Sequence, residues 1–155
     1  MSSFTIDVKK IGEKVNAILN GQINEDADFS ALKDAGGDVL VLNLKGVTHI
    51  NSCGIRDWVE FQNKYLEYKE IIYQECPQVI IEQMNIVAGF IHPNGRIESF
   101  VAPYYDETND EEIKILLTPE EIKDGKAPLK TNDAGEALEF DEIELQYFNF
   151  LKMKG

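Results

Sequence analysis

A short polar segment, residues 51–54, holds the residue types that could support regulated chemistry. Its serine, Ser52, stands between an apolar run typical of a buried strand and a stretch with helical spacing. The first turn of a helix has unpaired backbone N–H groups and a partial positive charge. A serine there can cap the helix, and the same dipole favours a phosphate attached to it. Ser52 is therefore a candidate phosphate acceptor, with an unmodified capping serine as the alternative.

Two further chemistries involve neighbours of Ser52. His49, Ser52 and Asp57 are the residue types of a hydrolase triad, but His49 lies at a predicted strand end and nothing indicates an oxyanion hole. Cys53 at a helix start could be redox-sensitive, or it could be a small buried residue. We therefore predict a protein without enzyme activity, without a cofactor and without a bound metal.

The elements that position Ser52 follow from the spacing of apolar residues. Residues 39–44 are almost continuously apolar, which predicts a central strand covered on both faces, with an interruption at Gly46. From Gly54 onward the period becomes helical. One predicted helix face holds Ile55, Trp58, Val59, Gln62 and Leu66.

The rest of the first 94 residues reads as alternating strands and helices. Residues 4–8 and 14–20 alternate apolar and polar side chains, which predicts two strands joined by a turn. A helix is predicted over 29–35, a buried strand over 70–74 and a helix over 77–90. This order predicts an α/β fold in which helices pack on a mixed β-sheet.

After a turn signal at residues 93–95, the pattern changes to a small β-rich extension over 95–155. Strands are predicted over 96–105, 112–117 and 137–140, with one helical turn over 119–126. A final helix is expected with Asp141 as its N-cap and an apolar face of Ile143, Tyr147, Phe150 and Leu151. The extension should pack against the 1–94 unit because it has many large rings: Phe100, Tyr104, Tyr105, Phe140, Tyr147, Phe148 and Phe150.

Charge restricts the partners of the chain. The net charge is −13, and residues 101–155 hold 14 acidic and 6 basic side chains, which gives −8. Such a surface repels phosphate backbones and anionic lipid, so we expect neither nucleic acid nor a membrane surface as a partner. The N-terminus MSSFTIDVKK lacks an apolar signal, and two cysteines make no disulfide framework, so a cytoplasmic protein is expected.

Several segments resemble the STAS domain, the sulphate-transporter and anti-sigma-factor-antagonist family. Residues 19–23 (LNGQI) look like the family's segment after its second strand, and residues 42–44 with 47–54 are similar to its pattern LDLsgVtfiDSsG. Residues 77–90 resemble the last helix of the domain. The resemblance covers roughly residues 4–91, with the motifs in the family's order and spacing.

The resemblance implies a bacterial regulator in signal transduction that acts by switching protein partners. In the family, a kinase phosphorylates a serine and a phosphatase reverses this, and the phosphorylation state decides which protein is bound. The acceptor position corresponds to Ser52, while Asn51 replaces the motif aspartate and lacks its charge. The expected partner is an anti-sigma factor or a histidine-kinase-like ATPase. It would contact the turn and the following helix at Asn51, Cys53, Gly54, Arg56 and Trp58.

Two alternative functions stay open, and the oligomeric state is undetermined. In one, the chain is a structural adaptor with an inert Ser52, and the extension supplies a docking surface. In the other, it senses a small ligand near Ser52.

The extension also resembles a zinc ribbon without its cysteines, because residues 106–109 and 131–134 stand where paired thiols would lie. A structural zinc needs about four Cys or His ligands, so bound zinc is disfavoured. The acidic loop 106–111 lacks the regular ligand spacing of a calcium loop and is expected to be a solvated turn.

Overall fold

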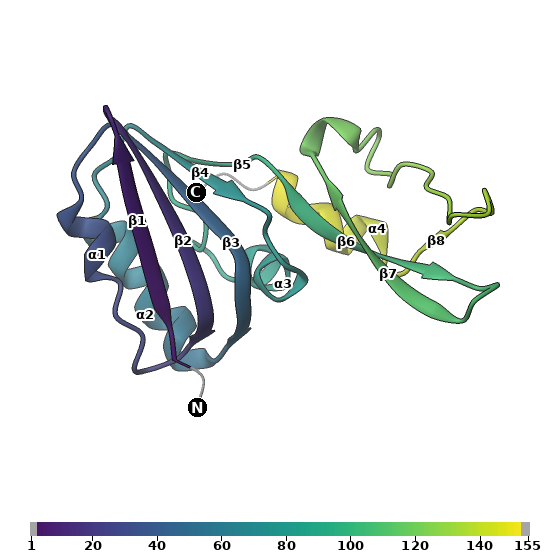
Figure 1. The fold of residues 1–155 in the computed structure, drawn as a ribbon, viewed down its shortest axis with the longest axis horizontal. Helices are drawn as coiled ribbons and strands as arrows, with labels where there is room; N and C mark the ends of the chain where they lie inside the picture. The colour runs from purple at the N-terminus through teal and green to yellow at the C-terminus, as the bar shows by residue number, and fades with distance from the viewer. Residues whose placement is uncertain (1–2, 153–155) are drawn as a thin grey trace.

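The structure, a computed structural model, describes residues 3–152 and contains two β-sheets (Figure 1). The first sheet has five strands in the order β1-β2-β3-β4-β5, in which β1 is antiparallel to β2 and the other neighbours are parallel. This confirms the predicted mixed sheet with the 39–44 run in its central strand. The strands are β1 (Thr5–Ile11), β2 (Lys14–Ile23), β3 (Val39–Ile50), β4 (Glu70–Gln74) and β5 (Gly95–Ile97).

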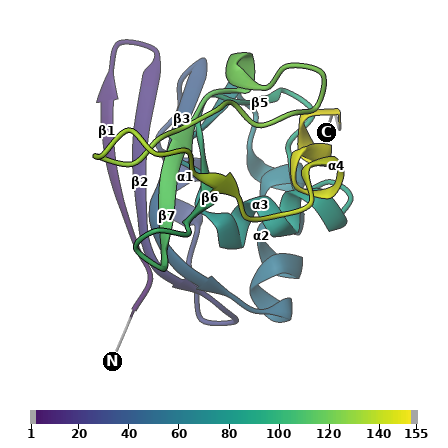
Figure 2. The same cartoon turned by 90° about the vertical axis from the view of Figure 1, so that its right-hand side faces the viewer.

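Three helices, α1 (Ser30–Asp34), α2 (Ser52–Tyr65) and α3 (Gln78–Ile86), lie on one side of this sheet (Figures 1 and 2). Every second strand residue faces them, including Leu40, Leu42 and Leu44 of β3, which join the core. Residues 39–44 are buried or half-buried on both faces of the sheet, as predicted, although the helices lie on one side only (Figure 1). On the face opposite the helices, Val41 is only 3% exposed.

The central strand also passes through Gly46 without a break, which corrects the predicted interruption. An added Cβ there would lie 1.8 Å from the Asn20 side-chain oxygen on β2 and 3.0 Å from Leu19 O, so a larger residue would require the Asn20 side chain to move. The pairing of β2 with β3 shifts register near this position. The missing side chain at Gly46 therefore leaves room for the neighbouring strand β2. The spacing of apolar residues along β3 does not reveal this, because it depends on a different strand.

The extension forms a second, antiparallel sheet in the order β7-β6-β8. The predicted strand over 96–105 is in fact two strands, because β5 pairs with β4 and the next strand begins a new sheet. Backbone hydrogen bonds fix the two residues between these strands to β4 and the residues after it: Glu98 N–H donates to Tyr73 O, and Cys76 N–H donates to Ser99 O. The elements are β6 (Phe100–Asp106), β7 (Glu111–Leu117), the 3-10 helix η1 (Pro119–Glu121), β8 (Glu139–Phe140), α4 (Glu144–Tyr147) and the 3-10 helix η2 (Phe148–Lys152).

The last segment differs from its prediction at its start. Helix α4 begins at Glu144, and Asp141 is not its N-cap, because the Asp141 N–H pairs with Pro103 O on β6. Ile143 is 62% exposed and does not belong to an apolar face. Tyr147 and Phe150 are buried, as expected.

A shared hydrophobic core and one asparagine join the extension to the first unit. The Phe100 ring lies 5.0 Å from the Phe150 ring, edge to face, and both belong to the same core as the first sheet. On α3, Asn85 donates from Nδ2 to Tyr147 O and accepts the Phe150 N–H at Oδ1. No helix within residues 3–152 is both long and apolar enough to cross a membrane.

A buried polar network ties α2 to the segment after α3. The Tyr73 hydroxyl donates to Gln62 Oε1 over 2.9 Å and accepts the His92 N–H over 2.9 Å. Gln62 Nε2 donates in turn to the carbonyls of Gly89 and Phe90. Tyr73 and Gln62 are fully buried, so water cannot replace a lost partner.

We therefore expect Tyr73→Phe to destabilise the fold. The change leaves Gln62 Oε1 and the His92 N–H without a partner, which should lower the free energy of unfolding by about 1–3 kcal/mol. Urea denaturation measures this, with Tyr65→Phe as the matched control because Tyr65 is exposed. Equal unfolding midpoints for the two variants would contradict this role of the network.

Candidate functional site

The turn over residues 51–54 lies where two parallel strands end together. Ile50 at the end of β3 pairs with Ile23 at the end of β2, and the Asn51 N–H donates to Ile23 O over 3.1 Å. Gly54 is buried against the same carbonyl, and an added Cβ would lie 2.2 Å from it. Only glycine therefore allows α2 to begin this close to the end of β2.

Asn51, and not Ser52, caps α2. Asn51 Oδ1 accepts the Gly54 N–H over 2.8 Å, and the Asn51 carbonyl accepts the Ile55 N–H over 2.8 Å. Ser52 is the first residue of the helix and is exposed, and its hydroxyl makes no hydrogen bond within residues 3–152. The capping alternative for Ser52 is therefore wrong, and its hydroxyl faces solvent at a helix N-terminus.

A carboxylate that sequence reasoning missed lies beside this cap. Asn51 Nδ2 donates to Glu25 Oε2 over 3.0 Å. The Glu25 carboxyl has a pKa below its ordinary value, first because it accepts its own backbone N–H and then because of Asn51. The signal was available in the acidic loop after β2, because the carboxyl ends of parallel strands meet at one edge of a sheet.

The other predicted contact residues are divided between surface and interior. Arg56 is exposed and pairs with Asp57 over 3.4 Å, and Cys53 is half-buried. Trp58 is only 2% exposed, and its ring lies 5.1 Å from the Phe29 ring. Trp58, like Gly54, therefore supports the core, and a partner at this turn would contact Asn51, Ser52 and Arg56.

The residue types of a hydrolase triad do not assemble here. His49 is exposed at the end of β3, and within the described chain no hydrogen bond joins it to Ser52 or Asp57. The Asp57 carboxylate pairs with Arg56 instead. Neither His49 nor Asp57 is therefore positioned to activate Ser52.

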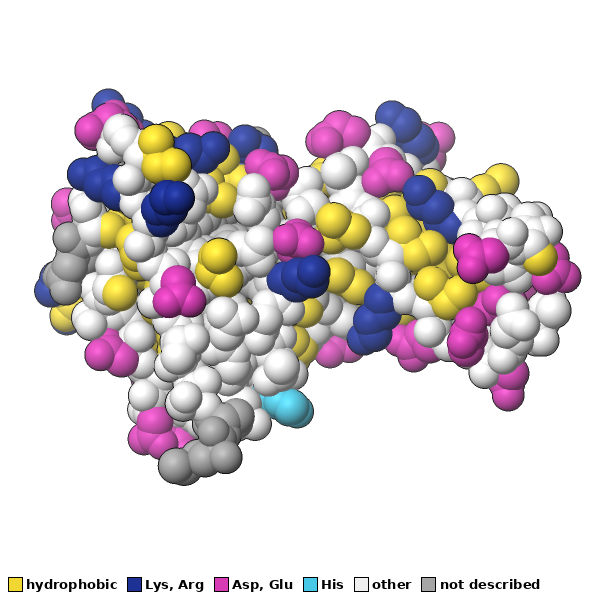
Figure 3. Space-filling view, in the orientation of Figure 1, with side chains coloured by type: hydrophobic (Ala, Val, Ile, Leu, Met, Phe, Trp, Pro, Cys, Tyr) yellow, Lys and Arg dark blue, Asp and Glu magenta, His cyan; other side chains and the backbone are white. Residues whose placement is uncertain are grey.

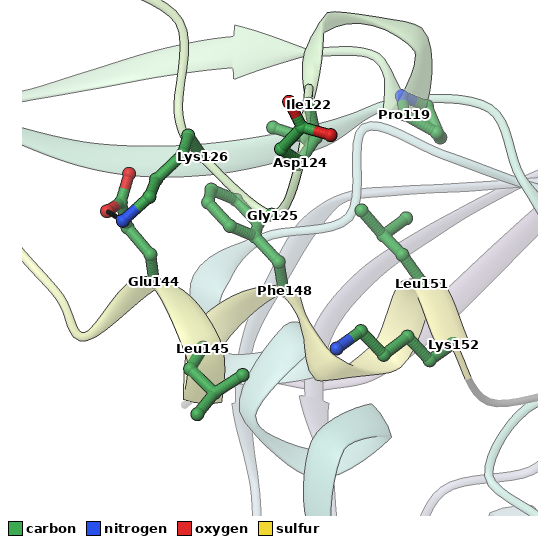
Figure 4. Close-up of a pocket in the computed structure, with 10 residues that line it drawn as sticks. All are labelled: Pro119, Ile122, Asp124, Gly125, Lys126, Glu144, Leu145, Phe148, Leu151 and Lys152. Carbon is green, nitrogen blue, oxygen red and sulfur yellow. Dashed lines mark ion pairs between the residues drawn. The ribbon is translucent and has the colours of Figure 1, made fainter.

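A groove of about 610 Å³ lies in the extension, not at the 51–54 turn (Figure 4). The C-terminal helical segment supplies Phe148 and Leu151, and the chain around η1 supplies Pro119 and Ile122. At one end the Lys126 ammonium pairs with the Glu144 carboxylate over 3.5 Å. The small-ligand alternative therefore has a candidate cavity in a different place from the one the sequence suggested.

The two turns compared with zinc-ribbon knuckles do meet, through a polar cluster formed by Asp106, Thr108, Asn109 and Asn132. Asp106 Oδ2 accepts from Asn109 Nδ2 over 2.8 Å and from Asn132 Nδ2 over 3.1 Å. Asp106 Oδ1 accepts the backbone N–H groups of Thr108 and Asn109. In residues 3–152 no three His, Cys, Asp or Glu side chains are placed to hold a metal ion. Hydrogen bonds join the turns in this chain.

Comparison with known proteins gives no family assignment. The sequence matches no protein-family model and no characterised protein.

The cap predicts a specific stability ranking at this turn. Asn51→Ala should lower the free energy of unfolding by about 0.5–2 kcal/mol, because the Gly54 N–H loses its acceptor. Asn51→Ser keeps an acceptor and should recover most of this loss, whereas Ser52→Ala should change stability by less than about 0.5 kcal/mol. Chemical denaturation gives the ranking, and an equal loss for Asn51→Ser and Asn51→Ala would refute the capping role.

The Asp106 cluster predicts an acid-dependent stability. Its hydrogen bonds, foremost that from the Asn109 side chain, hold the Asp106 pKa below its ordinary value. The resulting stabilisation is complete above about pH 5 and is lost as the pH falls below about 4, toward the lowered pKa of the folded state. Asp106→Asn should therefore unfold several degrees lower at pH 7 and show a weaker dependence of its unfolding temperature between about pH 5 and 3.

Asp133→Asn is the matched control, because Asp133 is exposed in the turn that presents Asn132. It should follow the wild-type pH profile. Parallel profiles for the wild type and Asp106→Asn would show that the cluster does not contribute to stability.

Proposed function

We propose that this chain is a non-enzymatic regulatory protein whose partner binding is controlled at Ser52, in the manner of the STAS family. The observation that supports this most directly is the exposed hydroxyl of Ser52 at the first position of α2, beside a separate capping residue. Because Asn51 already caps the helix, Ser52 is free for modification without loss of the cap. The fold order and the motif residues are compatible with that family.

The local backbone supports a phosphate at this place. The N–H groups of Ser52 and Cys53 donate no hydrogen bond within the described residues, so two donors lie unused at a helix N-terminus. A phosphate on Ser52 would add a charge of about −1.5 to −2 and would be attracted by these groups. The modification is therefore compatible with an intact helix.

The same phosphate would change the surface that a partner meets. Glu25 already lies beside Asn51, and Arg56 is exposed on the next turn of the helix. Added negative charge would repel an acidic partner and could recruit Arg56 away from it. We infer that the unmodified form binds the partner, which by the family resemblance is an anti-sigma factor or a histidine-kinase-like ATPase.

The substitution Asn51→Asp would recreate the motif aspartate of the family, but the structure adds a condition. Its new carboxylate would face Glu25, whose Oε2 is 3.0 Å from Asn51 Nδ2. Two like charges at that distance repel. Any gain as a kinase substrate should therefore be larger in Asn51→Asp combined with Glu25→Gln.

A second candidate is an adaptor that docks through its extension with Ser52 inert. It is favoured by two apolar side chains that remain exposed on adjacent helices, Ile86 of α3 at 76% and Leu145 of α4 at 72%. Both line one hollow of about 490 Å³. A docking partner there would be insensitive to the state of Ser52.

The two candidates give opposite results in one affinity experiment with native lysate. Ser52→Asp should reduce recovery of the specific partner at least about tenfold, through charge repulsion, and Ser52→Ala should retain it. Ser30→Asp is the control, since Ser30 is also exposed at the first position of a helix. Mass spectrometry of the native protein then tests for phosphate on Ser52.

The proposal fails if Ser52→Asp, Ser52→Ala and the control Ser30→Asp all recover the same partners and no phosphate is found on Ser52. In that case Leu145→Asp, which places a charge on the exposed apolar surface, should abolish recovery and support the adaptor instead.

A further inference from the structure

Strand β1 leaves one edge of the first sheet open. It is the outermost strand, has seven residues, and pairs only with β2 among the described residues. A two-residue loop joins the two strands, and such a loop closes on a hydrogen-bonded pair, here Ile11 with Lys14. Hydrogen-bonded pairs alternate along an antiparallel ladder, so Thr5, Asp7 and Lys9 also bond toward β2.

The alternation directs the backbone groups of the remaining residues outward. The residues with outward-directed backbone groups are Ile6, Val8 and Lys10. Their N–H and C=O groups have no hydrogen-bond partner within residues 3–152. An exposed row of this kind is a template for a further strand. The sequence of β1, TIDVKKI, determines which strand fits it.

We propose that β1 pairs antiparallel with β1 of a second copy of this chain, around a two-fold axis at Val8. In this register Val8 lies opposite Val8 of the second copy, and Ile6 lies opposite Lys10. Both are pairs of outward-directed residues, so each makes two backbone hydrogen bonds. A two-fold axis makes every contact occur twice, as in other isologous dimers.

The charges of β1 are complementary to themselves in this register alone. Asp7 lies opposite Lys9 of the second copy, at a non-hydrogen-bonded pair where cross-strand side chains are closest. An axis at Lys10 would place two Lys10 side chains opposite each other and Asp7 opposite Glu13. An axis at Ile6 would leave both Asp7–Lys9 pairs unmade.

The position of β1 also reduces repulsion between two acidic chains. Strand β1 and the extension lie at opposite ends of the molecule, and acidic side chains are numerous toward the extension (Figures 1 and 3). Residues 101–155 hold 14 acidic and 6 basic side chains, which is −8 of the net charge of −13. Pairing through β1 therefore keeps the most acidic parts of both copies apart.

Sedimentation equilibrium of the whole chain over about 5–500 µM tests the pairing, since a single strand edge gives a small interface and a weak dimer. Asp7→Lys and Lys9→Asp should each raise the dissociation constant at least about tenfold, because like charges then face each other. The double variant Asp7→Lys/Lys9→Asp restores opposite charges and should recover wild-type dimerisation. Both residues are exposed, so each variant should fold.

Val8→Pro is the independent test, because proline removes an outward N–H that takes no part in the ladder with β2. It should give a monomer with a wild-type circular dichroism spectrum. The proposal is overturned by a wild-type chain that stays monomeric throughout, by single charge variants that dimerise normally, or by a double variant that fails to recover. If Val8→Pro does not fold, the charge exchange alone decides.

Discussion

The close approach between the end of β2 and the start of α2 is the constraint on which the candidate site depends. Ile23 O accepts the Asn51 N–H, and Gly54 lies against the same carbonyl, so strand end and helix start hold each other in place. This contact presents Asn51 as the cap and leaves Ser52 exposed at the next position. A larger residue at 54 would displace the helix start and with it the serine.

Asparagine side chains join distant turns in the part of the chain that the structure describes. Glu25 reaches Asn51 from the loop after β2, and Asn132 reaches Asp106 from a turn 26 residues later. In both pairs an asparagine amide donates to a carboxylate, a bond stronger than one between neutral groups. The extension can therefore hold its two turns together without thiols.

The three candidate binding surfaces lie on different parts of the molecule. The proposed modification concerns the N-terminus of α2, the proposed self-pairing concerns the outer edge of β1, and the exposed apolar side chains lie on α3 and α4. None of them shares a residue with another. A change in phosphorylation, in association or in docking can therefore be measured separately in the same chain.

Local patterns in the sequence determined most of the elements. The apolar run over 39–44 and the helical period from Gly54 onward predicted a central strand and α2, because such patterns depend on near neighbours alone. Tertiary structure decided what depends on distant segments. It assigned residues 95–97 to the first sheet, buried Trp58 against Phe29, made Gly46 continuous with β3, and placed Glu25 beside Asn51. Each of these four features depends on which segments pack or pair together and on where the strand ends meet. The spacing of apolar residues along one segment does not show which other segment it will contact.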